Sequence, residues 1–265
     1  MTVAEMTTSP DGTAIAFDRT GDGPPLIVVG GAFNDRRTPA ALAELLAESF
    51  TVYSYDRRGR GDSGDTPPYA VEREIEDLEA VIAAAGGSAA VYGHSSAAQL
   101  ALETAARGVS VTKLAMYEPP YVVDESGPVK SANYLDRMDE AIAEGRRRDA
   151  VAQFMTESVG MPAEMVAGLL DSPMGAGLEQ LAHTLPYDER IMERYQRGRP
   201  LPAEWRDAVT VPSLVMDGGN SPEWMRNGCQ ALVRLLPDVA YRTLEGQDHR
   251  ENPEAVAPVL ARFLA

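Results

Sequence analysis

A serine at the centre of residues 91–98, Val-Tyr-Gly-His-Ser-Ser-Ala-Ala, is the clearest candidate for chemistry in this chain. Gly93 precedes Ser95 by two residues and Ala97 follows it by two, close to the Gly-x-Ser-x-Gly pattern of a nucleophile elbow, with alanine at the second glycine position. In such an elbow a strand turns sharply into a helix, the hydroxyl projects above the sheet, and small neighbours let strand and helix approach each other. The alternative is an ordinary strand-to-helix turn in which Ser95 is the N-cap.

The elements around Ser95 must place it at the end of a strand. Apolar runs predict strands at residues 3–8, 13–18, 26–29, 51–55, 89–92, 113–117, 212–216 and 240–244. Helical spacing predicts helices at residues 40–47, 71–85, 96–107, 223–236 and 253–264. The first two strands flank a Pro-Asp-Gly turn signal and form a hairpin. The later alternation of strands and helices predicts a mostly parallel α/β sheet with helices on both faces.

A long segment interrupts this alternation after the sixth predicted strand. Residues 119–207 are mostly helical in pattern and hold no convincing strand. We therefore expect a core domain of residues 1–118 and 208–265, with residues 119–207 inserted as a helical cap over one edge of the sheet. In such sheets ligands bind beyond the carboxyl ends of the strands, which is where Ser95 is expected.

Composition excludes several classes of function. The chain has 265 residues, 44% of them hydrophobic, and 24 basic against 40 acidic residues give a net charge of −16. A surface this acidic repels a phosphate backbone, so nucleic acid is not an expected partner. The single cysteine, Cys229, cannot form an internal disulfide and fits a reducing cytoplasm, where we expect it to be buried. No signal peptide or membrane-spanning run is evident, so a cytoplasmic protein without a membrane partner is expected; a homodimer is left open.

Taken together, these motifs resemble the α/β-hydrolase superfamily with a helical cap, over nearly the whole chain. The resemblance includes the hairpin, the turn at Gly30 and Gly31, the elbow, a histidine before the last helix, and residues 55–63, Tyr-Asp-Arg-Arg-Gly-Arg-Gly-Asp-Ser. In this family the stretch like 55–63 shapes a loop beside the site, and we give it no catalytic role. The resemblance implies a hydrolase that needs no cofactor or metal.

The resemblance also implies a general base. Only three histidines are present. His94 adjoins Ser95 in the elbow and cannot readily fold back onto its neighbour's hydroxyl, and His183 lies in the insertion. His249 follows the last predicted strand, where the family's base falls, and there it could take the proton from Ser95 and return it to the leaving group.

The third member of the family's catalytic triad, an acid that orients the base, departs from the usual pattern here, because Ser221 occupies the expected position. Two carboxylates could replace it: Glu118, which ends the sixth predicted strand, and Asp217, which ends the seventh. A glutamate at the former position, followed closely by proline, is similar to the zearalenone-type lactone hydrolases. We therefore expect Glu118 and keep Asp217 open; the alternative role for Glu118 is a hinge residue paired with a surface arginine.

Two backbone donors are expected to form an oxyanion hole. The N–H of Ser96, directly after the nucleophile, is one, and the N–H of Ala32 is the other, with Phe33 as second choice. Gly31 is the small residue that allows this approach.

The insertion suggests the kind of substrate. Six of the eleven methionines fall within it: Met138, Met155, Met161, Met165, Met174 and Met192. Such residues are usually core, but together they indicate an adaptable apolar cavity, to which His183, Tyr187 and Trp205 could add polar contacts. We expect a small-molecule substrate, an apolar ester or lactone, cleaved through an acyl-enzyme. The alternatives are a cyclase, lyase or C–C hydrolase on the same fold, and a non-catalytic ligand-binding relative.

Overall fold

A mixed sheet forms the centre of the molecule. The computed structural model describes residues 4–265, and within them the sheet has eight strands in the order β1-β2-β4-β3-β5-β6-β7-β8. The strands are β1 (Glu5–Thr8), β2 (Ala14–Thr20), β3 (Pro25–Val29), β4 (Thr51–Tyr55), β5 (Ala89–His94), β6 (Val111–Tyr117), β7 (Ser213–Gly218) and β8 (Val239–Leu244). The β1–β2 and β2–β4 pairs are antiparallel and the others are parallel, so the predicted α/β-hydrolase fold is confirmed.

Two apolar layers cover the two faces of the sheet. Side chains of β3 alternate between them: Leu26 and Val28 pack with α1 (Ala40–Leu46) and α11 (Pro253–Leu264), whereas Ile27 and Val29 pack on the opposite face. That second face is covered by α2 (Val71–Ala84), α3 (Ser96–Ala106) and α10 (Glu223–Leu235). Continuous apolar runs in the central strands follow from this double burial.

The predicted strands and helices all have counterparts; β4 and α11 have the predicted ends, and the ends of the others are shifted. β5 runs two residues further than predicted, to His94, because the strand continues to the elbow itself. Cys229 is buried in α10, as expected. Val3, at the start of the predicted hairpin, lies outside the described residues.

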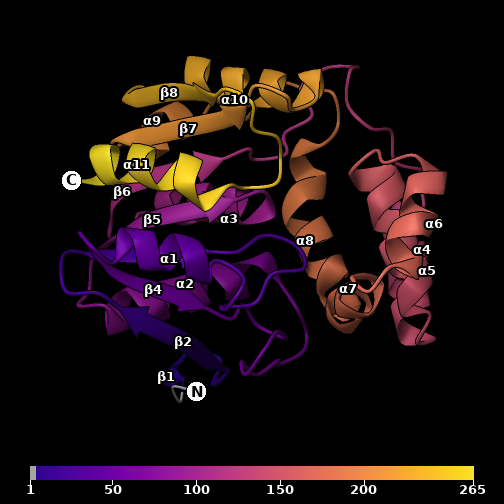
Figure 1. Ribbon diagram of the computed structural model, residues 1–265, viewed down its shortest axis with the longest axis horizontal. Coiled ribbons are helices and arrows are strands. Elements are labelled where there is room, and N and C mark those ends of the chain that lie inside the picture. The colour runs from indigo at the N-terminus through magenta and orange to yellow at the C-terminus, as the bar shows by residue number, and fades with distance from the viewer. Residues whose placement is uncertain (1–3) are drawn as a thin grey trace.

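The segment predicted as a cap lies beyond the carboxyl ends of the strands (Figure 1). It contains α4 (Tyr134–Ala143), α5 (Arg147–Gln153), the π-helical turn η1 (Phe154–Ser158), α6 (Ala163–Asp171), α7 (Gly175–Leu181), η2 (Ala182–Thr184), α8 (Leu185–Met192), η3 (Glu193–Tyr195) and α9 (Trp205–Ala208). Helices α4 to α8, with η1 and η2, share an apolar core of their own, which also contacts Ala32 and Phe33 of the loop after β3. Helix α8 contacts α3 and lies between the sheet and helices α4 to α6 (Figure 1). Among residues 4–265, no helix is both long and apolar enough to cross a membrane.

Candidate active site

The turn between β5 and α3 has the geometry of a nucleophile elbow. Ser95 has φ 58° and ψ −128°, in the left-handed region that residues with a Cβ seldom adopt. A Cβ at Gly93 would lie 2.5 Å from the carbonyl oxygen of Ala97 and 2.8 Å from Cα of Ala98, so only glycine fits beneath the turn. Ala97 is fully buried there, which shows that a methyl group is accommodated at the second small position.

A line of hydrogen bonds joins Ser95, His249 and Glu118, three residues far apart in the chain. His249 Nε2 lies 3.1 Å from Ser95 Oγ, and His249 Nδ1 lies 2.7 Å from Glu118 Oε2. The other oxygen of Glu118 accepts a hydrogen bond from the N–H of Gly218 at 2.7 Å. Burial raises the pKa of this carboxyl, but the hydrogen bond and charge of His249 outweigh burial, and the pKa lies below its ordinary value. Glu118 is therefore ionised near neutral pH.

Backbone strain is concentrated at this place. Within residues 4–265, the non-glycine residues with positive φ are Phe33 at 61°, Ser95 at 58° and Glu118 at 47°. Each follows or ends a strand at the carboxyl edge of the sheet, and Phe33 and Ser95 line the same cavity. Such conformations cost about 1–3 kcal/mol each and persist where the surrounding structure fixes them, which is typical of functional sites.

The structure separates the two carboxylates that the sequence left open. Asp217 is fully buried, and one of its oxygens accepts a hydrogen bond from the hydroxyl of Tyr241 on β8. Burial raises its pKa above the ordinary value. It is Glu118 that lies against His249, while Ser221 is a buried neighbour of Gly218.

His94 has a structural role that the sequence did not indicate. Burial, with a smaller contribution from the nearby His249, lowers the pKa of His94 to about 3, so the ring is neutral near pH 7. Its Nε2 lies 3.0 Å from the carbonyl oxygen of His249, and a neutral ring there donates its N–H to that oxygen. His94 thus holds the backbone of His249 without reaching Ser95.

The loop after β3 lies directly against the elbow. A Cβ on Gly31 would lie 2.9 Å from the carbonyl oxygen of His94 and 3.0 Å from Cβ of Ser95, so glycine is required for the close approach. The carbonyl of Gly31 accepts hydrogen bonds from Arg60 Nη1 at 2.6 Å and from the N–H of Asn34 at 3.3 Å. This approach brings the segment that holds Ala32 beside Ser95.

A small apolar cavity of about 200 Å³ opens above Ser95 and His249. Its wall is formed by Ala32, Phe33, Asn34, His94, Pro120, Phe154, Met155, Ser158, Val159, Met192, Gln196, Trp224 and Met225. No arginine, lysine or carboxylate is among these described lining residues. Besides Ser95 and the two imidazoles, the lining residues with polar side-chain groups are Asn34, Ser158, Gln196 and Trp224.

Some expectations for the cavity wall were wrong. His183 instead lies 2.7 Å, through Nε2, from the carbonyl oxygen of Gly59; Tyr187 donates to Asp65; and Trp205 packs among aromatic rings near Tyr121. Of the six methionines, Met155 and Met192 line the cavity, Met138 is core, Met161 is partly buried against that core, and Met165 and Met174 are exposed. Trp224 and Met225, from α10, had no sequence signal beyond their helical pattern.

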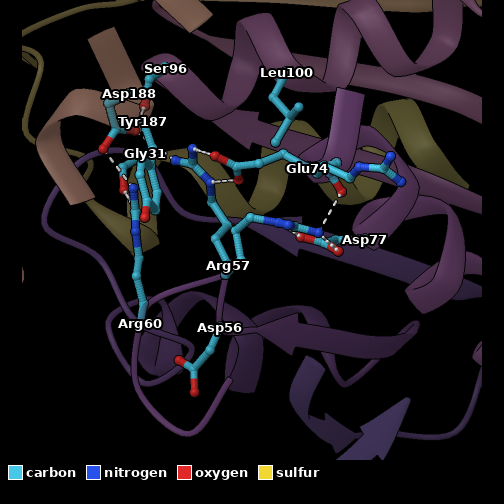
Figure 2. A network of polar contacts seen from close by, with 12 residues as sticks. Gly31, Asp56, Arg57, Arg60, Glu74, Asp77, Ser96, Leu100, Tyr187 and Asp188 are labelled. Atoms are coloured by element: carbon cyan, nitrogen blue, oxygen red, sulfur yellow. Dashed lines mark hydrogen bonds and ion pairs between the residues drawn. The ribbon is translucent and has the colours of Figure 1, made fainter. Parts of the chain in front are cut away.

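A buried network of charges, which the sequence did not reveal, reaches the elbow at Ser96 (Figure 2). Asp188 of α8 accepts hydrogen bonds from Arg57 Nη1 at 2.7 Å, Arg60 Nη2 at 2.6 Å and the hydroxyl of Ser96 at 2.7 Å. Arg57 also forms two 2.7 Å hydrogen bonds with Glu74 of α2. Arg57, Arg60 and Asp188 are all at least 98% buried. Among residues 4–265, no cluster of three or more His, Cys, Asp or Glu could hold a metal ion.

Comparison with known proteins gives one consistent family. The model of the alpha/beta hydrolase family matches residues 21–259. The chain is 35% identical over 238 residues to the N-formylmaleamate deformylase of Pseudomonas putida. The aligned region covers 86% of this chain and 83% of that protein. An alpha/beta hydrolase structure from Sphaerobacter thermophilus is 53% identical, with a TM-score of 0.93 over 98% of this chain and 100% of that one. A thermophilic esterase from Thermogutta terrifontis shares the fold at 21% identity, with a TM-score of 0.69 over 99% of this chain and 98% of that one.

Proposed function

This chain belongs to the alpha/beta hydrolase family, and on that premise we propose that it is a serine hydrolase of small, uncharged carboxylic esters or lactones. The observation that carries the proposal is the line of hydrogen bonds from Glu118 through His249 to Ser95, which ends at an apolar cavity. A nucleophile, a base and an orienting acid in this order are what acyl transfer requires.

In the proposed reaction, Ser95 Oγ attacks the carbonyl carbon of the substrate as His249 Nε2 takes the hydroxyl proton. The tetrahedral intermediate then expels the alcohol, which receives that proton from His249, and Ser95 is left acylated. Water, deprotonated by His249, attacks the acyl group, and the proton returns to Ser95 as the acid leaves. The cycle consumes only water.

Glu118 serves this cycle by its charge and its position. Its carboxylate accepts from His249 Nδ1, which fixes the tautomer that leaves Nε2 free to accept a proton. The N–H of Gly218 holds the second carboxylate oxygen, so Glu118 cannot rotate away. The same carboxylate stabilises the imidazolium that forms after proton transfer.

The backbone N–H groups of Ser96 and Ala32 are proposed to bind the oxyanion. Ser96 follows the nucleophile at the start of α3, where the first N–H groups of a helix lack partners within it. Ala32 follows Gly31, whose backbone lies against the elbow, and both Ala32 and Ser95 line the cavity.

The cavity limits the substrate. About 200 Å³ is small beside the roughly 300–1,000 Å³ of sites for drug-sized ligands, so short acyl groups fit best. Without a cation in its described wall, the cavity offers no opposite charge to balance a carboxylate on the substrate.

The assay that tests the proposal uses p-nitrophenyl acetate and butyrate with the wild type and Ser95→Ala. We expect turnover by the wild type, loss of at least about 10³-fold in kcat for Ser95→Ala, and a fluorophosphonate adduct on Ser95. Unchanged turnover in Ser95→Ala would refute the assignment. A wild type that accepts the fluorophosphonate but hydrolyses no ester would favour a cyclase or lyase, and failure to react with either would favour a binding protein.

Deformylation of an amide is the second candidate, favoured by 35% identity with the N-formylmaleamate deformylase. A maleamate carries a carboxylate, and the described cavity wall has no cation to receive it. We therefore expect a kcat/KM for N-formylmaleamate below that for p-nitrophenyl acetate. The reverse order would select the deformylase.

A further inference from the structure

Asp188 connects the insertion to the two segments that hold the proposed oxyanion donors, the elbow with Ser96 and the loop after β3 with Ala32. It lies on α8, yet its two carboxylate oxygens reach the elbow and the loop after β3 by separate routes (Figure 2). Asp188 is fully buried and does not line the cavity, so it cannot touch the substrate.

The first route runs through Ser96. Asp188 Oδ1 accepts the Ser96 hydroxyl at 2.7 Å, and the backbone N–H of this same Ser96 is one proposed oxyanion donor. Ser96 is fully buried, so the hydrogen bond does not compete with water. It ties the first residue of α3 to the inserted helix.

The second route runs through Arg60. One guanidinium nitrogen, Nη2, donates to Asp188 Oδ2 at 2.6 Å, while the other, Nη1, donates to the carbonyl oxygens of Gly31 at 2.6 Å and Asn34 at 3.2 Å. In a trans peptide the C=O and the N–H point in opposite directions. Because Arg60 holds the Gly31 carbonyl, the N–H of Ala32 in the same peptide unit is turned away from Arg60. The planar guanidinium makes this a fixed link.

Resting on the proposed function, we propose that Asp188 is a positioning residue that holds both oxyanion donors, Ser96 through its hydroxyl and Ala32 through Arg60 and the Gly31 carbonyl. The two amides then take their catalytic orientation together, and only while α8 is seated on α3. Seating of the inserted helices and formation of the oxyanion hole are thereby one event.

The charges around Asp188 explain why the link holds. Burial raises the pKa of Asp188, but Arg60, Arg57 and the Ser96 hydroxyl outweigh burial and keep it below the ordinary value. Glu74 balances the second positive charge through Arg57, so the buried group contains two cations and two anions. The side chain of Asp188 is therefore ionised in the neutral pH range of an esterase assay.

Ser96→Ala is the decisive variant, because it keeps the backbone N–H and the two arginine contacts of Asp188 and removes only the hydroxyl link. We expect kcat for p-nitrophenyl acetate to fall about tenfold to a hundredfold, with KM nearly unchanged, since misplaced donors weaken transition-state binding only. Ser96→Thr, which retains a hydroxyl, should recover most of the rate. Affinity for a trifluoromethyl ketone, whose adduct carries an oxyanion, should fall by the same factor as kcat/KM.

Glu74→Gln is the matched control. Glu74 belongs to the same buried network, but its described contacts reach Arg57 and Tyr69 and not Ser96 or Arg60. Its substitution should lower the stability of the fold and leave kcat near the wild-type value. Asp188→Asn should show a loss of kcat similar to that of Ser96→Ala.

The outcomes separate this inference from the proposed function. If Ser95→Ala is inactive while Ser96→Ala keeps the wild-type kcat and ketone affinity, the serine mechanism stands and the positioning role is overturned. Equal losses of kcat in Ser96→Ala and Glu74→Gln would also overturn it, because the network would then act through general stability. If Ser95→Ala keeps its activity, the proposed function itself has failed.

Discussion

Glu118 directly follows β6 and Asp217 lies at the last position but one of the neighbouring parallel strand β7, yet only Glu118 faces His249. Tyr117 of β6 pairs with Met216 of β7, so the next residues, Glu118 and Asp217, would share one face if β6 continued. The positive φ of Glu118, 47°, breaks the pleat and turns its side chain to His249 Nδ1 at 2.7 Å. Asp217 remains within β7 and is held by Tyr241.

This difference predicts unequal effects of removing each charge. Glu118→Gln should lower kcat on p-nitrophenyl acetate by about 10²–10⁴-fold, because the tautomer of His249 and the imidazolium lose their partner. Asp217→Asn should keep close to the wild-type rate. Steady-state kinetics of the two variants decide between them: a rate loss confined to Asp217→Asn would reassign the acid.

The neutral state of His94 predicts a pH dependence of stability. With a folded pKa of about 3 and an ordinary value of 6.5, His94 takes up a proton on unfolding between these pH values. The unfolded state binds more protons there, so the free energy of unfolding should decrease as the pH falls from 6.5, by up to about 1.4 kcal/mol per pH unit from this group.

Urea unfolding between pH 6.5 and 4.5 measures this slope, with His94→Gln as the control. The amide of glutamine can donate to the His249 carbonyl but does not titrate. The wild type should therefore lose more stability over this interval than His94→Gln does. Identical slopes in the two proteins would mean that His94 is protonated in the folded state.

Met155 predicts the chain-length preference of the site. It lies on η1 and lines the cavity, so Met155→Ala should lengthen the cavity and raise the ratio of kcat/KM for p-nitrophenyl octanoate over acetate. Met138→Ala is the control, because Met138 is fully buried in the core of the inserted helices and does not touch the cavity. It should cost about 2–5 kcal/mol of stability and leave the ratio unchanged. A ratio that moves equally in both variants would point to general loosening of these helices.

Two glycines predict opposite effects of an added methyl group. Gly93→Ala would place Cβ 2.5 Å from the carbonyl oxygen of Ala97, so it should lower both the melting temperature and the activity. Gly168 lies inside α6 with nothing within 4 Å of a Cβ, so Gly168→Ala should raise the free energy of unfolding by about 0.5–1 kcal/mol. Thermal melts of both variants check this; an active, fully stable Gly93→Ala would contradict the elbow geometry.

Local pattern was enough to predict the sheet and the placement of Ser95. Strand and helix periodicity, the small residues around Ser95 and the position of His249 after the last strand are properties of short segments, and the family resemblance ordered them. The contacts of His183 and Tyr187 were not predictable in this way, because they depend on which face of the inserted helices turns to the core.

The amino-acid pattern alone was enough to predict a mostly parallel sheet, with a serine at the end of one strand and a histidine after another, because periodicity and turn chemistry act over a few residues. That Glu118 faces His249 became evident from the folded structure, since this contact depends on a single backbone angle at the end of β6. The folded structure also shows that Asp188 is buried between Arg57, Arg60 and Ser96. Asp188 is distant in the chain from the other three residues. An arginine-rich loop and an acidic helix residue have the same sequence pattern whether they face water or each other.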